Sequence, residues 1–224
     1  SHGTNLCLMY RREREVRTLQ VSQTVRIALT QAVQRLHQRR WCDGTGGNFC
    51  VVVDREPLQL LMAPSGVDKG AVTSGDLIVV NAEGKVVKGN GRASAETLMH
   101  LRIVDQCGAG AVLHTHSINA TWLSKTFLDQ GSLVLEGWEM MKGLEGINTH
   151  ATSIELPIIN NNQDLKILSE TAGQRLERAP YGLLVSGHGL YAWGADLEQA
   201  RRHTEILEFL MELAWRQTLV TNHS

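Results

Sequence analysis

Residues 111–117 read AVLHTHS, so two histidines stand one residue apart at the end of an apolar run. In a strand, alternate side chains point to the same face, and His114 and His116 would therefore project side by side. Neutral imidazole is the usual nitrogen ligand of zinc, and a catalytic zinc takes three protein ligands with one position left for substrate. The third ligand is expected to be His188, because the glycines beside it in SGHGL allow a tight bend and a close approach of the backbone. The spacing predicts one zinc ion per subunit.

The alternative interpretation is that these histidines are ordinary polar residues at the end of a strand. A lone histidine would favour that interpretation, whereas the pair together with a glycine-flanked histidine favours a metal site. The remaining histidines are expected to be ordinary polar residues of helix faces, a loop or the chain end: His37, His100, His150, His203 and His223.

Small residues form three elements that could bind an anion. GTGGN, residues 44–48, lacks the Lys-Ser/Thr of a P-loop and follows a helix, so it is not a dinucleotide fingerprint either. Its glycines could still let successive N–H groups converge on a phosphate, with Asn48 as a further donor, although an ordinary loop is equally expected. APSG, residues 63–66, is a second small-residue turn. Ser94 before a predicted helix would be the third, because helix N-termini attract anions.

Two glutamates are candidates for proton transfer. Glu96 is expected in the first turn of a helix, where the helix dipole stabilises the charged form of the carboxyl. Glu139 lies in the apolar and aromatic stretch LEGWEMMKG. Apolar surroundings raise the pKa of a carboxyl toward neutrality, which suits a general acid or base, so Glu139 is preferred over Glu96.

The segments that would position these residues alternate between helical and extended patterns. Helices are expected at residues 22–39, 94–106, 119–128 and 165–178, and from the Asp196–Gln199 capping box onward. Strands are expected at residues 49–53, 58–63, 77–81, 111–116 and 154–160, followed by two short strands within 182–194. Many connections are too short for parallel crossovers. The pattern predicts an α/β fold: a single three-layer α/β/α domain with a central, largely antiparallel or mixed sheet.

Composition excludes some partners. The formal net charge is −1, from 22 Lys and Arg against 23 Asp and Glu, so neither nucleic acid nor a membrane is an expected partner. The four cysteines have no C-x-x-C spacing, which indicates reduced thiols in a cytoplasmic protein. No apolar stretch is long enough to span a membrane. We expect one catalytic domain over residues 21–224, after an N-terminal segment, residues 1–20, whose Ser1 and His2 look like a cloning remnant.

Five motifs in a fixed order carry a family resemblance. GTGGN, APSG, RASAETLMH, AVLHTHS and SGHGLYAWG resemble the class II aldolase superfamily, over about residues 22–219. The resemblance implies a zinc ion on the three histidines that polarises the carbonyl of a small sugar-phosphate substrate. It also implies a homo-oligomer, usually a tetramer with sites at subunit interfaces. It places the substrate phosphate near six residues: Gly46, Gly47, Asn48, Ser65, Gly66 and Ser94.

Within the superfamily, WEMMKG and THATSIELPIINNNQDL are most similar to its sugar-phosphate dehydratases. In those enzymes the acid/base glutamate lies in the E-M-x-K-G segment, which is Glu139 here, whereas the aldolases have it at the position of Glu96. Ala95 stands where many aldolases place a second phosphate-binding serine. The resemblance implies a zinc-dependent hydro-lyase with Glu139 as the acid/base residue and Glu96 as a candidate second one.

Two other functions stay open. An aldolase or epimerase could use the same scaffold, although the E-M-x-K-G setting of Glu139 argues against it. Adducin-type head domains resemble the fold without being enzymes, so a non-catalytic interaction domain is the second alternative. The presence of all three histidines and a nearby carboxylate argues against that domain.

Overall fold

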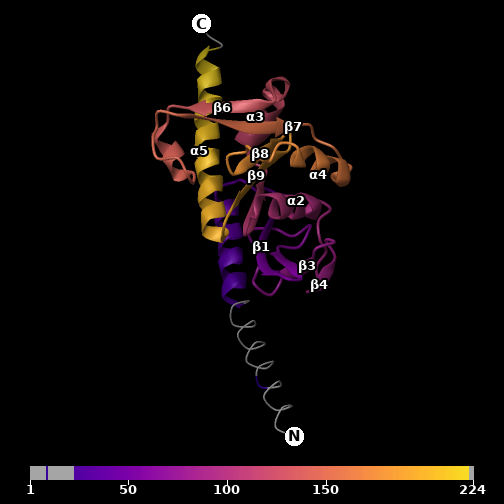
Figure 1. Ribbon diagram of the computed structural model, residues 1–224. Helices are drawn as coiled ribbons and strands as arrows, with labels where there is room; N and C mark the ends of the chain where they lie inside the picture. The colour runs from indigo at the N-terminus through magenta and orange to yellow at the C-terminus, as the bar shows by residue number, and fades with distance from the viewer. Residues whose placement is uncertain (1–8, 10–22, 222–224) are drawn as a thin grey trace.

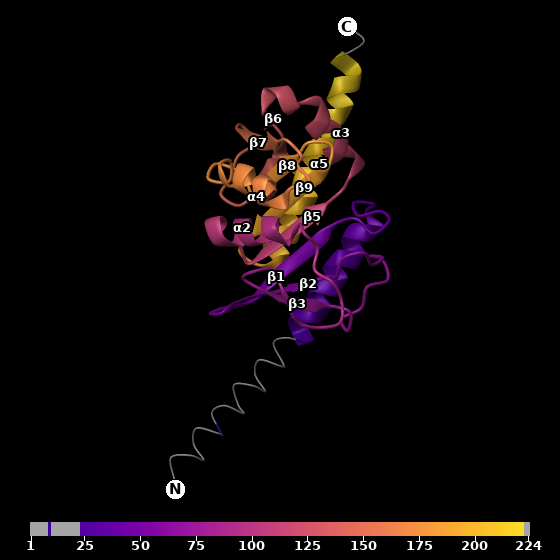
Figure 2. The ribbon, with the colours of Figure 1, turned by 90° about the vertical axis from the view of Figure 1, so that its right-hand side faces the viewer.

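The computed structural model describes residue 9 and residues 23–221. Its strands, most of them labelled in Figure 1, are β1 Asn48–Arg55, β2 Leu58–Met62, β3 Ile78–Asn81, β4 Val86–Lys88, β5 Ala111–Thr115, β6 Ser132–Glu136, β7 Ser153–Ile159, β8 Gly182–Val185 and β9 Gly189–Gly194. They form one nine-stranded sheet in the order β4-β3-β2-β1-β5-β9-β8-β7-β6, which Figure 2 shows from β6 at the top to β3 at the bottom. Only β7 and β8 pair in parallel, so the expected largely antiparallel, mixed sheet is confirmed.

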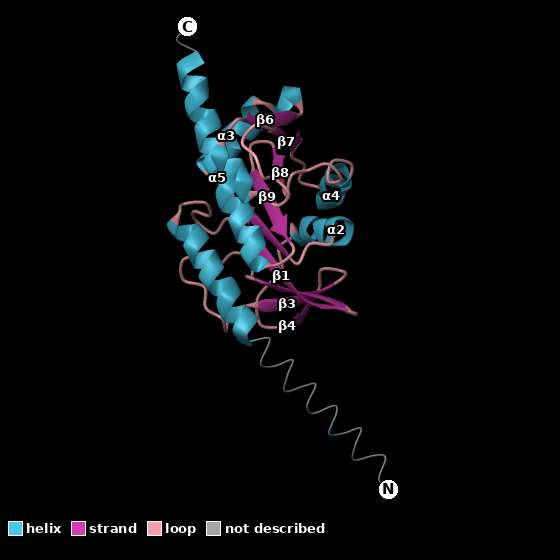
Figure 3. Ribbon diagram, turned by 60° about the vertical axis from the view of Figure 1, so that its left-hand side comes forward, coloured by secondary structure: helices cyan, strands magenta, loops and turns pink. Residues whose placement is uncertain are grey.

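Helices cover both faces of this sheet (Figure 3). The helices are residues 23–38, α2 Thr97–Cys107, α3 Ile118–Thr126, α4 Leu165–Gly173 and α5 Leu197–Thr221, with short 3-10 helices η1 Leu128–Gln130 and η2 Glu139–Gly143. α2 and α4 pack on one face through Met99 and Leu168. The helix at residues 23–38, α3 and α5 pack on the other. The expected three-layer α/β/α architecture is therefore confirmed.

The alternation of side chains along β1 explains the two layers. Cys50 packs into the cluster that contains α2 and α4, whereas Phe49 and Val51 pack into the cluster that contains the helix at residues 23–38. Both faces of the strand are apolar because both faces of the sheet are covered. Each fully buried side chain of this size contributes about 1.5–3 kcal/mol to folding through loss of contact with water.

Three predicted boundaries are wrong. α2 begins at Thr97 and not directly after Ser94, because the Ser94 carbonyl accepts from the Thr97 N–H at 3.1 Å in a tighter turn that precedes the α-helical hydrogen bonds. The helix expected to reach Arg178 ends at Gly173, where similar tight turns close its last residues. The helix expected at residues 119–128 divides into α3 and η1. β4 and β6 have no counterpart among the expected strands.

β5 lies between β1 and β9 at the centre of the sheet, and all its residues are buried. A Cβ atom on Gly189 would come within 2.0 Å of the Thr115 carbonyl oxygen, so only glycine allows β9 to begin this close to β5. The site residues on and after β5 are thus fixed by two neighbouring strands.

Of the four cysteines, Cys42, Cys50 and Cys107 are free thiols, and Cys7 lies outside the described residues. Over the described part of the chain, we find no helix with the length and apolar character needed to cross a membrane.

Candidate metal centre

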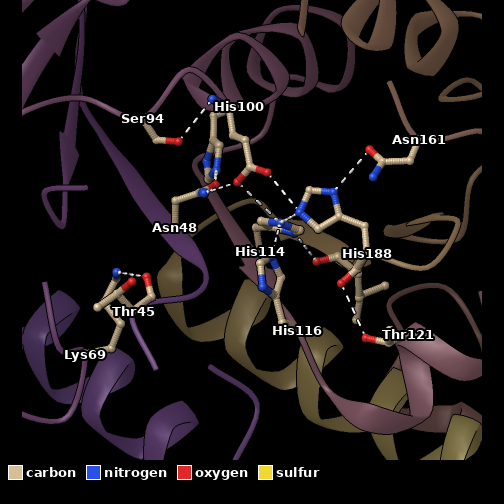
Figure 4. Close-up of polar contacts among 12 residues, drawn as sticks. Thr45, Asn48, Lys69, Ser94, His100, His114, His116, Thr121, Asn161 and His188 are labelled. Carbon is tan, nitrogen blue, oxygen red and sulfur yellow. Dashed lines mark hydrogen bonds and ion pairs between the residues drawn. The ribbon is translucent and has the colours of Figure 1, made fainter. Parts of the chain in front are cut away.

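Four side chains from three separate segments converge at the end of β5 (Figure 4). Glu96, His114, His116 and His188 each offer one ligand atom, and these atoms lie within 4.8 Å of one another. The Nε2 atom of His114 lies 2.8 Å from Nε2 of His116 and 3.2 Å from Nε2 of His188. The three histidines predicted to bind zinc are therefore brought together, with a carboxylate beside them.

The protonation of the rings fits a metal ion. The Nδ1 atom of His114 lies 2.9 Å from the carbonyl oxygen of Leu190, which can only accept, so Nδ1 carries the proton and Nε2 presents its lone pair. Burial lowers the pKa of His114 well below its ordinary value and that of His116 to about 4, which keeps both rings neutral. Three imidazole nitrogens and a carboxylate are a donor set suited to zinc and to other divalent transition metals.

The turn that carries His188 is braced by its surroundings. Its backbone N–H donates to the Val185 carbonyl at 3.0 Å and closes the connection between β8 and β9. The Ser124 hydroxyl, on α3, accepts from the N–H of Gly187 at 3.0 Å. The Nδ1 atom of His188 lies 3.4 Å from the Asn161 side-chain oxygen, which directs Nε2 toward the other donors. The side chain of His188 is 17% exposed, so the cluster is reachable from solvent.

Glu96 belongs to the same cluster. Its Oε1 atom lies 2.9 Å from Nε2 of His188, and Oε2 lies 3.5 Å from Nε2 of His114. Burial alone would raise the pKa of this carboxyl, but His188, His114 and the amide of Asn48 hold it well below its usual range. The direction agrees with the expectation that Glu96 is a charged carboxylate, and these side chains are its causes.

Residues 27–215 match the family described as Class II Aldolase and Adducin N-terminal domain. The chain belongs to this family. Methylthioribulose-1-phosphate dehydratase of Serratia proteamaculans is 41% identical over 198 residues, which cover 86% of this chain and 95% of that protein. The protein of the same name from Stenotrophomonas maltophilia is 40% identical over 184 residues, which cover 81% and 85%.

Solved structures agree on the class II aldolase fold. An L-fuculose 1-phosphate aldolase matches with a TM-score of 0.72 at 25% identity and covers 90% of this chain and 88% of its own. The L-fuculose-1-phosphate aldolase from Thermus thermophilus matches with a TM-score of 0.71 at 24% identity and covers 89% and 98%. The family resemblance and the fold class expected from the sequence motifs are both confirmed.

The small-residue turns of this class II aldolase domain are joined by a buried lysine. Lys69 is 1% exposed, and its Nζ atom donates to the Thr45 carbonyl at 2.9 Å and to the Val67 carbonyl at 3.1 Å. It therefore connects the turn at 44–48, as Figure 4 shows for Thr45, to the residue that directly follows the turn at 63–66. Among the described residues it has no ion-pair partner, although Asp68 is close enough to act on its pKa, which burial lowers.

The residues predicted to bind phosphate occupy these turns and the segment before α2. Gly47 and Gly66 have positive φ angles of 83° and 76°, and Gly46 lies so close to His116 that a Cβ atom would approach Nδ1 to 2.9 Å. Ser65 donates its N–H to the Arg92 carbonyl at 2.8 Å, which brings its turn beside the segment that holds Ser94. Two of the predicted phosphate-binding side chains also have partners within the chain. The Ser94 hydroxyl accepts from the Glu96 N–H at 3.1 Å, and the Asn48 amide bonds to Glu96 and His100.

Glu139 does not join the cluster within one chain. It begins η2, and its side chain is 70% exposed. The hydrogen bond from Lys142 lowers its pKa, with Nζ 2.8 Å from Oε1, and His150 adds to the effect. The predicted raised pKa is wrong for the single chain, because the neighbouring Trp138 and Met140 do not cover the carboxylate and a lysine one turn away reaches it.

Sequence reasoning missed two contributors to the site. His100 was expected to be an ordinary polar residue, but it is fully buried and contacts Asn48. Its spacing of four residues from Glu96 would place both on one helix face, and that signal could have found it. Lys69 left no comparable signal, because a lysine after a turn is normally exposed.

Proposed function

We propose that this chain is a zinc-dependent methylthioribulose-1-phosphate dehydratase, a cytoplasmic enzyme of the methionine salvage pathway. It would convert 5-methylthioribulose 1-phosphate to 2,3-diketo-5-methylthiopentyl 1-phosphate with loss of one water. The observation that carries the proposal is the convergence of three histidines and Glu96. This chain is also 41% identical to a relative of that name, and the match covers 95% of the relative's length. Zinc is the proposed ion because three imidazoles and a carboxylate are donors that suit it.

The reaction removes the proton from C3 and the hydroxyl from C4, and the resulting enol becomes the 2,3-diketone. Bound zinc would supply Lewis-acid stabilisation of the negative charge that develops on the substrate oxygens. The turns at 44–48 and 63–66, joined by Lys69, would bind the phosphate and hold C3 and C4 in one orientation. Glu96, charged and hydrogen-bonded, would keep its carboxylate directed at the ligand cluster.

Glu139 is proposed as the acid/base residue, acting in the site of a neighbouring subunit. Within its own chain it lies on the surface and contacts Lys142 and His150 and no member of the cluster. A tetramer with sites between subunits would bring an exposed carboxylate to the ligands of the next chain. Cover by that subunit would exclude water and raise the pKa of Glu139 toward neutrality. It would take the C3 proton and then protonate the departing C4 hydroxyl.

The second candidate is an aldolase that cleaves a C–C bond of a sugar phosphate. The position of Glu96 in the cluster favours it, as does the match to an L-fuculose 1-phosphate aldolase at 25% identity. Both reactions begin from a sugar phosphate bound in the same way, so the products decide between them.

The test is product analysis with the zinc-loaded protein and two substrates, methylthioribulose 1-phosphate and L-fuculose 1-phosphate. The dehydratase converts the first to a diketone that has lost one water and leaves the second unchanged. Formation of dihydroxyacetone phosphate and an aldehyde from either substrate would support the aldolase instead.

A further inference from the structure

A line of buried polar side chains leads away from the metal cluster into the core (Figure 4). Asn48 donates from Nδ2 to Oε2 of Glu96. The side-chain oxygen of Asn48 lies 2.6 Å from Nε2 of His100, and Nδ1 of His100 lies 3.1 Å from Sγ of Cys50. Asn48 is 6% exposed and His100 and Cys50 are fully buried, so water cannot replace these partners.

The donor and acceptor groups of these side chains fix the direction of each hydrogen bond in this line. A carboxylate only accepts, so Asn48 must turn its NH₂ toward Glu96 and its oxygen toward His100. His100 must then donate from Nε2. A neutral imidazole has one proton, so its Nδ1 accepts and Cys50 must donate its S–H. Burial lowers the pKa of His100 to about 4 and raises the pKa of Cys50 to about 12, which agrees with a neutral ring and a protonated thiol.

The four side chains of this line come from one strand and from the start of one helix, and the regular spacing of each element places its two residues on one face. Asn48 and Cys50 are two residues apart on β1 and share one face of the strand. Glu96 and His100 are four residues apart and lie one turn from each other at the start of α2. The polar pair on the strand faces the polar pair on the helix, inside an apolar cluster that contains Cys50, Met99 and Ile103. A buried polar pairing of this kind has one satisfied arrangement, and the wrong orientation of any member leaves a buried group without a partner.

We propose that Cys50 and His100 are positioning residues that act through Asn48 to fix the carboxylate of Glu96 in the metal cluster. Without the Cys50 proton donor, Nδ1 of His100 is a buried acceptor that has lost its partner, so the ring is no longer held in the orientation that directs its Nε2 proton at Asn48. The Asn48 oxygen then lacks a fixed donor, and the amide is free to rotate away from the carboxylate. Glu96 loses its hydrogen bond and with it the fixed contact with His188. The inference rests on the proposed function only in that the cluster binds a divalent ion, and it does not depend on which sugar phosphate is the substrate.

The test compares Cys50→Ala with Cys50→Ser in the full-length protein. Serine keeps a donor at the same atom position, whereas alanine removes it and changes little volume. The measurements are the affinity for Co²⁺ in competition with a chelator, the visible absorption spectrum of the Co²⁺ protein and the thermal midpoint. We expect Cys50→Ala to bind Co²⁺ about tenfold more weakly with an altered spectrum, which is the usual size of such an effect behind a metal ligand. Cys50→Ser should bind within about threefold of wild type by the same reasoning. Cys107→Ala is the matched control, since Cys107 lies at the far end of α2 and outside this line of side chains.

A double mutant tests whether Cys50 affects metal binding through Glu96. In a Glu96→Gln background the acceptor of the line has changed, so adding Cys50→Ala should weaken Co²⁺ binding no further. Three outcomes would each overturn the proposal. The first is a Cys50→Ala protein with the Co²⁺ affinity and spectrum of wild type. The others are equal losses of Co²⁺ affinity in the alanine and serine variants, and additive losses of Co²⁺ affinity in the double mutant. Because none of these measurements uses turnover, a failure of the proposed dehydratase activity would leave them unaffected.

Discussion

The Nε2 atoms of His114 and His116 lie 2.8 Å apart, and burial holds both rings in the neutral form. Two neutral imidazole nitrogens this close, with a third from His188, are arranged to share one metal ion. His116→Ala removes one ligand from a partly exposed position and should yield a folded protein without bound zinc. Elemental analysis of purified protein checks this, with His150→Ala, whose side chain is 64% exposed, as the control that keeps one zinc per chain.

One zinc per chain in His116→Ala would show that the ligands are elsewhere. Wild-type protein with no stoichiometric zinc or other divalent metal would favour the non-catalytic, adducin-like alternative.

Lys69 is a buried cation between the two turns proposed to bind phosphate. Lys69→Met has a similar volume and removes the charge, and replacement of an unpaired buried ion by an apolar residue should not unfold the chain. The KM for the phosphorylated substrate should rise roughly 10- to 100-fold, because a charge-assisted interaction is worth about 1.5–3 kcal/mol. Zinc content should not change. Steady-state kinetics on this variant and on Lys85→Met, an exposed lysine, give the comparison, and equal KM values for the two would refute a role of Lys69 in phosphate binding.

Glu208 on α5 is buried behind the end of β5, with Oε1 3.4 Å from the Thr115 hydroxyl and Oε2 without a partner among the described residues. Burial raises the pKa of its carboxyl from 4.5 to about 7, and the nearby Ser117 and Thr115 side chains offset this only in part. The folded state therefore keeps a proton that the unfolded chain has lost, and its stability falls as pH rises from about 4.5 to about 7.

Glu208→Gln removes the titrating group. It should be close to wild type in stability at pH 5 and more stable at pH 8, by on the order of 3 kcal/mol at most. Urea unfolding at both pH values measures the difference, with Glu198→Gln, an exposed residue of the same helix, as control. A difference between Glu208→Gln and wild type that is the same at both pH values would mean that Glu208 does not titrate in this range.

Glu139 of one subunit is proposed to act beside the histidine cluster of a neighbouring subunit. Exchange of subunits between two inactive variants tests this. Glu139→Gln alone should keep zinc and lose about 10² to 10⁴ in kcat, the range that general acid/base groups supply. His116→Ala alone should be inactive for lack of metal. Subunits of the two variants, exchanged at equal concentrations, should regain up to about a quarter of wild-type activity, because random pairing reunites an intact cluster with an intact Glu139 at one site in four.

Each variant taken alone through the same exchange is the control. If subunits exchange and no activity returns, Glu139 does not act in trans. Near wild-type turnover in Glu139→Gln together with collapse in Glu96→Gln would transfer the acid/base role to Glu96 and favour the aldolase.

Sequence patterns were sufficient for the parts of this molecule that depend on local spacing. The alternation at His114 and His116 and the glycines around His188 predicted side chains that the fold does bring together. The cap expected at Asp196–Gln199 is present in part: the Asp196 carboxylate accepts from the Gln199 N–H at 2.8 Å, and the Gln199 side chain accepts from the Ala195 N–H instead of that of Asp196. These features are decided by neighbours in sequence, so they can be read without the fold.

Burial of single polar residues could not be predicted in the same way. Trp138 and Met140 suggested an apolar environment for Glu139, yet burial depends on what packs over a segment, and the described part of one chain leaves this carboxylate largely exposed. Lys69 and Glu208 were missed for the same reason, because the residues that enclose them are distant in sequence. β6 was missed because its apolar run, residues 133–135, is only three residues long and lies in a strand at one end of the sheet.

The most direct measurement is a zinc titration of metal-free wild-type protein with methylthioribulose 1-phosphate as substrate, followed by the appearance of the diketone product. The three-histidine cluster predicts that the rate rises with added zinc and saturates at one equivalent per chain, with loss of one water from each substrate molecule and no C–C cleavage. Full diketone formation by the metal-free protein, or fragments from C–C cleavage in place of the diketone, would contradict a metal-dependent dehydratase.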